Sequence, residues 1–230
     1  MMTGLLMIPT ALLLALWGRV AFRLAAGPER GPDLSTAGLS ALTGYGGVLI
    51  AIRSGPGVGS VETELALCVF GALLLLVAWI DQRTAWAPDG ITLPLMFGGA
   101  ASAGLIGSVG IGPISAIGVA FGIFIAAQVF WAAQAISGFR LLPPADLMAL
   151  SLPILLFGLS PYAPLTYLLL SALLLIALRG PEPVYRLIRG PAAEAAVRDA
   201  GLSGAGRSAP LLPMALGSLF VALLLRLTQG

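Results

Sequence analysis

The chain has 230 residues, of which 58% are hydrophobic and only 10% are charged, and its formal net charge is +2. Soluble globular domains carry about 25% charged residues. This chain therefore cannot cover a water-facing surface, and its mean hydropathy of +1.00 predicts an integral membrane protein with lipid around it. The positive balance is too small for the basic patch that nucleic-acid binding requires, so we expect no nucleic-acid partner.

The residue inventory narrows the chemistry that the chain can carry. It has no histidine, and its single cysteine, Cys68, lies inside an apolar run. A histidine metal site, a Ser-His-Asp triad, a Cys-His pair and a cysteine zinc cluster are therefore all absent. Carboxylate chemistry remains, and we expect neither a metal nor a cofactor.

The apolar runs predict an all-α bundle of about eight transmembrane helices, with six or seven if one run merges or is lost. A span needs about 17 to 25 residues, and several of these runs are short. The first run lacks the positive start of a signal peptide, so we interpret it as a retained span. The predicted spans are Met2–Phe22, Thr36–Ile52, Val61–Ile80, Ile91–Ile106, Gly112–Ile136, Asp146–Phe157, Pro164–Leu178 and Leu211–Leu225. The weakest are the glycine-rich second span and the sixth, which contains Pro153.

The arginines support this topology, because most of them fall in alternate connections. These connections are Arg23–Ser35, Asp81–Gly90, Ser137–Ala145 and Arg179–Pro210. The positive-inside rule places them in the cytoplasm and both termini outside. On the opposite side, Arg53 is offset by Glu62 and Glu64. We expect one membrane domain over residues 1–230, in which 179–210 is a cytoplasmic linker that contains arginine and has the composition of a short helix at 191–201.

A run of small residues from Gly98 to Gly104 gives the fourth predicted span a smooth side. Small residues let membrane helices approach closely. We therefore expect this side to pack against another helix.

Three aspartates stand at predicted helix ends on the cytoplasmic side. The helix dipole disfavours a negative charge at Asp81, which ends its span, and favours one at Asp146, which begins its span. If these two ends meet, their pKa values are pushed apart, as an acid–base pair around a water requires. An N-cap role is the alternative for Asp146 and the preferred one for Asp89. From the residues alone, an aspartyl active site and a proton- or ion-coupled transporter both remain open.

Three segments resemble type IV prepilin peptidases. Ile80–Pro94 reads IDQRTAWAPDGITLP and resembles the first signature of that family, in which six residues separate an aspartate from Pro-Asp. With Arg83, this segment is most similar to the short forms of the family, which serve tight-adherence pili. The second signature, Gly-x-Gly-Asp-x-Lys, falls on PPADLM around Asp146, and Pro210–Gly217 resembles the closing segment. The likeness covers about Val61 to Leu225.

The resemblance implies an intramembrane aspartic endopeptidase at the cytoplasmic face of the inner membrane. Asp81 and Asp146 would be its catalytic residues, and its substrate would be a prepilin or pseudopilin with a basic leader and an apolar helix. The cysteine tetrad of the longer bifunctional forms is missing, so we expect no N-methyltransferase activity. Pro143, Ala145 and Met148 replace the two glycines and the lysine of the second signature.

These replacements keep a second hypothesis open. It is a catalytically silent relative that acts as an assembly or scaffold subunit of a pilus or secretion system. A small proton-coupled carrier is a third hypothesis. Carriers place their ionisable residues near the middle of the membrane, whereas these aspartates lie at the ends of spans, which argues against it.

Overall fold

The computed structural model describes residues 2–26, 33–56, 58–84, 87–105, 112–137, 152 and 212–229. Every element in these ranges is a helix, and they contain no strand, which confirms the all-α class for this part of the chain. The elements are α1 (Met2–Leu5), α2 (Met7–Ala26), α3 (Leu34–Ser54), α4 (Val61–Thr84), α5 (Asp89–Leu105), α6 (Pro113–Ser137) and α11 (Leu212–Gln229).

Among the helices that the structure describes, four are long and apolar enough to cross a membrane. They are Met7–Leu24, Leu34–Ser54, Val61–Gln82 and Pro113–Ala133. The predicted fourth and last spans are also helical, as α5 and α11. The predicted sixth and seventh spans lie outside the described residues, apart from Leu152, as do 179–210, so the eight-span count stays a prediction. The glycine-rich segment, one of the two weakest predicted spans, is one continuous helix of 21 residues.

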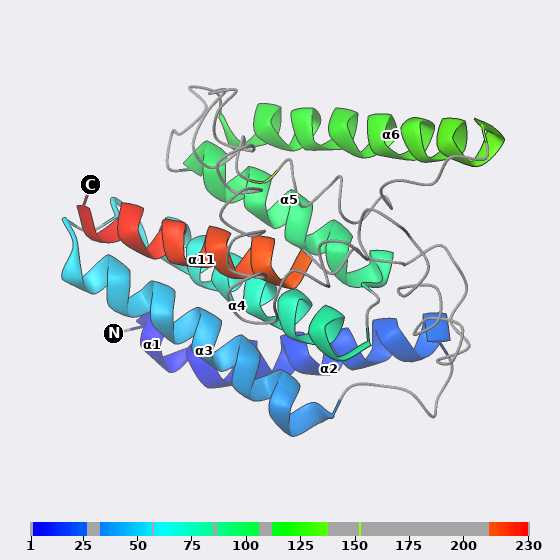
Figure 1. The fold of residues 1–230 in the computed structure, drawn as a ribbon. Helices are drawn as coiled ribbons and strands as arrows, with labels where there is room; N and C mark the ends of the chain where they lie inside the picture. The colour runs from blue at the N-terminus through cyan, green and yellow to red at the C-terminus, as the bar shows by residue number, and fades with distance from the viewer. Residues whose placement is uncertain are drawn as a thin grey trace.

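Helix α4 is the centre of the bundle. It packs against α2, α3, α5 and α11 (Figure 1). Its residues are apolar all round, which is the pattern of a helix buried on every side. Phe70, Leu74, Leu76 and Ile80 are fully buried in it. By contrast, α6 packs on α5 among the described helices and presents many apolar side chains outward.

Helix α3 lies especially close to α4, because glycines face each other where the two cross. A Cβ added to Gly44 would collide with the backbone carbonyl oxygen of Gly71. A Cβ added to Gly71 would in turn collide with Val48. Close backbone contact of this kind is how membrane helices gain packing energy when lipid is as apolar as their side chains.

The helices run alternately up and down, so chain connections gather at two ends. Both termini lie at one end, and α4 joins α5 at the other (Figure 1). This is the relative placement that the arginine pattern predicted: Asp81 and Asp89 lie at the end of the bundle that is opposite both termini.

A polar network lies at the end of the bundle that holds both termini. Arg53 forms an ion pair with Glu64 at 2.9 Å between Nη2 and Oε2. The Thr3 hydroxyl donates to the same carboxylate oxygen at 3.1 Å, and the Tyr45 hydroxyl donates to the Thr3 carbonyl at 2.8 Å. The network ties α1, α3 and α4 together, and it shows that Glu64 is the partner that offsets Arg53.

Candidate functional site

Asp81 lies in the last turn of α4, which ends at Thr84, and its residue is only 3% exposed. Positions 70, 74, 77 and 81 are spaced by four, three and four residues, so they share one face of the helix. Phe70, Leu74 and Val77 on this face are completely buried. Asp81 therefore continues an inward-facing apolar stripe, at the end of the helix where the sequence predicted it.

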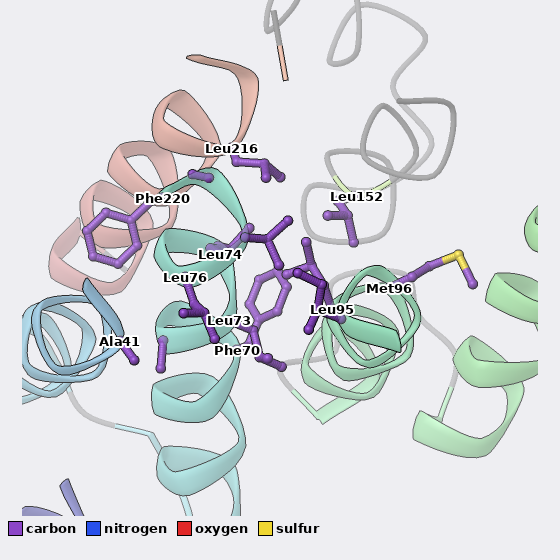
Figure 2. Close-up of a cluster of buried hydrophobic side chains, with 14 of the residues drawn as sticks. Ala41, Phe70, Leu73, Leu74, Leu76, Leu95, Met96, Leu152, Leu216 and Phe220 are labelled. Carbon is purple, nitrogen blue, oxygen red and sulfur yellow. The ribbon is translucent and has the colours of Figure 1, made fainter. Parts of the chain in front are cut away.

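This face of α4 meets α5 and Leu152. A Cβ built on Gly99 would lie 2.7 Å from Leu152 Cδ2 and 2.9 Å from the Phe70 ring, so the three residues are in contact. Figure 2 shows Leu152 directed toward Phe70 and Leu95, in the space between α4 and α5. The predicted close packing of the small residues in the fourth span is thus confirmed at Gly99.

Asp146, the second predicted catalytic residue, lies outside the described residues, together with Pro143, Ala145 and Met148. The pairing of Asp81 with Asp146 therefore stays a prediction. Leu152 is the one described residue of the predicted span Asp146–Phe157, and it is 1% exposed. At that residue the chain packs against the α4 face that carries Asp81.

The first turn of α5 is capped by a backbone carbonyl. The carbonyl oxygen of Pro88 accepts from the N–H of Ile91 at 2.9 Å and of Thr92 at 3.1 Å. Pro88 therefore caps the helix, and Asp89 is its first residue. The predicted N-cap role of Asp89 is wrong by one position, because the carbonyl before it already accepts the first helical bonds.

Asp89 keeps a favourable electrostatic position, since the positive end of the helix dipole stabilises a carboxylate in the first turn. Its side chain reaches solvent, but neighbouring protein atoms desolvate the carboxyl and raise its pKa above the ordinary value of 3.8. Its location before the apolar run that starts at Ile91 places it at the mouth of the bundle. Asp81 and Asp89 thus differ, with Asp81 enclosed and Asp89 facing outward.

Helix α2 supports the turn from outside. The Trp17 indole N–H donates to the Gly90 carbonyl at 2.8 Å. A Cβ on Gly90 would lie 3.0 Å from Ala21 Cβ, and one on Gly18 would lie 3.3 Å from Ile80 Cδ1. Sequence reasoning did not single out Trp17 or Gly18, because a tryptophan and a glycine in an apolar span are ordinary membrane residues.

Within the described ranges, no three His, Cys, Asp or Glu side chains gather in a way that could hold a metal ion. A scan against protein-family models and searches of curated proteins and solved structures find no match to this chain.

Proposed function

We propose that the chain is a membrane-embedded aspartic endopeptidase of the prepilin peptidase type. It removes the leader of a prepilin or pseudopilin at the cytoplasmic face of the inner membrane. The observation that carries the proposal is the burial of Asp81 in the last turn of the central helix, which ends at Thr84. A carboxylate enclosed at the mouth of a membrane helix is costly to keep and is a functional candidate for that reason.

In this proposal Asp81 and Asp146 hold a water molecule between them. One carboxylate takes a proton from the water as it attacks the scissile carbonyl, and the other carboxyl group gives a proton to the leaving amine. The two groups must lie within hydrogen-bond reach of that shared water. Leu152, six residues after Asp146, lies near Phe70, which is on the same face of α4 as Asp81 but about 16 Å from it along the helix at about 1.5 Å per residue.

The position of Asp81 along its helix favours hydrolysis at the membrane surface over ion transport. Asp81 is three residues from the end of α4, which corresponds to about 4.5 Å at a rise of about 1.5 Å per residue. Carrier sites lie near the middle of the bilayer. A substrate with a basic leader in water and an apolar helix in lipid would present its cleavage site at the depth of Asp81.

The test is a cleavage assay in membranes. The chain is co-expressed with a pilin precursor from the same genome, and the loss of the leader is followed by gel. We expect cleavage by the wild type and none by Asp81→Asn or Asp146→Asn. Asp33→Asn is the matched control, because Asp33 is an exposed carboxylate that caps α3, and asparagine also caps helices. It should cleave like the wild type.

Two results would refute the peptidase. One is cleavage that persists in both catalytic-site variants. The other is an uncleaved precursor, across several candidate pilins, when the protein is well expressed and inserted. The second result would favour the silent relative, which tolerates Asp81→Asn and Asp146→Asn in pilus assembly. Pro143→Gly and Met148→Lys would then test whether the altered second signature is the reason.

A further inference from the structure

Helix α5 contains a proline one turn after its start. Pro94 has no N–H, so it cannot donate to the carbonyl four residues earlier, which is that of Gly90. Gly90 is exposed, so its carbonyl must accept either from water or from a donor on another element. The first turn of α5 therefore has one acceptor that its own helix leaves open.

Trp17 supplies the missing donor from a different helix. Its indole Nε1 lies 2.8 Å from the Gly90 oxygen, although the two residues are 73 positions apart in the chain. Trp17 is 52% exposed on the outside of α2, so packing alone does not account for its orientation. The bond explains why a tryptophan, which has a donor, stands there rather than another apolar residue.

The surrounding contacts hold α2 at the level where this bond can form. Gly18 brings the α2 backbone against Ile80, the neighbour of Asp81, and Ala21 lies against Gly90. Neither approach leaves room for a larger side chain without movement. Helix α2 thus touches the end of α4 and the beginning of α5 at once.

We propose that Trp17 is a positioning residue for the first turn of α5. By giving Gly90 the hydrogen bond that Pro94 withholds, it fixes the first turn of α5, which carries Asp89, against α2. The inference deepens the proposed function and rests on it for the role of the turn in catalysis. The hydrogen bond and its dependence on Pro94 do not rest on that function.

A double-mutant cycle tests the bond without any activity assay. Trp17→Phe keeps the ring and removes the donor, and Pro94→Ala gives the helix an N–H for Gly90. Amide hydrogen exchange of the peptide over residues 89–95 is measured in the full chain. We expect Trp17→Phe to speed this exchange by about threefold to tenfold, the range for one lost hydrogen bond. In the Pro94→Ala background the same change should have little effect.

Trp131→Phe is the control, because it makes the same change at a half-buried tryptophan on a different helix, α6. Equal effects of Trp17→Phe in both backgrounds would overturn the proposal, and so would an equal effect of Trp131→Phe. If Pro94→Ala does not insert, the comparison of Trp17→Phe with Trp131→Phe decides alone.

Cleavage kinetics then test the positioning role. We expect Trp17→Phe to lower kcat and leave KM unchanged, and Pro94→Ala to restore kcat in the double variant. A coupled exchange effect with unchanged kcat would overturn the positioning role. Absence of cleavage by the wild type would count against the peptidase itself, while the exchange cycle would still decide on the bond.

Discussion

Replacement of Gly44 by alanine tests the close crossing of α3 and α4 on which the bundle depends. The added Cβ would lie 2.8 Å from the Gly71 carbonyl carbon and 2.9 Å from Ala72 Cα. Carbon atoms normally approach to about 3.5–4.0 Å, so the two backbones must separate by roughly 1 Å. Both obstacles are backbone atoms, which cannot turn aside as a flexible side chain does. Overpacking of this kind costs about 1–3 kcal/mol.

Gly46→Ala is the matched control on the same helix. Its Cβ would meet only Met7 Sδ, at 3.5 Å, which is an ordinary contact with a flexible side chain. Both substitutions gain the same helix propensity, about 1 kcal/mol, so this term cancels in the comparison. Gly44→Ala should therefore be less stable than Gly46→Ala by about 1–3 kcal/mol, measured by thermal or denaturant unfolding in detergent. Equal stability of the two variants would refute the close crossing.

Three further predictions concern other parts of the bundle. Glu64→Gln should lower the free energy of unfolding by no more than about 1 kcal/mol, because its ion-pair partner Arg53 is half exposed. Glu62→Gln, at an exposed position, should leave the free energy of unfolding unchanged. Phe70→Ala should lower the free energy of unfolding by about 3–5 kcal/mol, through the lost burial and the cavity that it leaves. The outward-facing Phe121→Ala should leave it nearly unchanged. The Ser35 hydroxyl donates to the Asp33 carboxylate and lowers its pKa below the ordinary value of 3.8. The ionised carboxylate therefore stabilises the fold above pH 3.8, and this stabilisation is lost as the pH falls through the pKa of the folded state. Asp33→Asn should remove this pH dependence from the unfolding midpoint.

The helices α2, α3, α4 and α6 could be predicted from the sequence because their apolar runs have the length of a membrane span. The position of Asp81 also followed from sequence, since a long apolar run ends there. The error at Asp89 arose because Asp is a frequent N-cap, whereas here the chain uses the carbonyl of Pro88. The bond from Trp17 to Gly90 could not be predicted. The sequence shows that Pro94 deprives a carbonyl of its helical donor, but it does not show which distant helix supplies another donor.

The burial of Asp81 has a cause in the packing of α4. A helix with neighbours on several sides offers few positions where a charge can reach lipid headgroups or water, and most of its residues are apolar for that reason. In the last turn the choice of residue is freer, because the chain is about to leave the bundle. An aspartate placed there on the outward side would need no explanation. This one shares its face with Phe70 and Val77 and is 3% exposed. The chain therefore bears a desolvation cost at this position that an alanine or leucine would avoid, and a residue retained at such a cost is expected to act in the function of the protein.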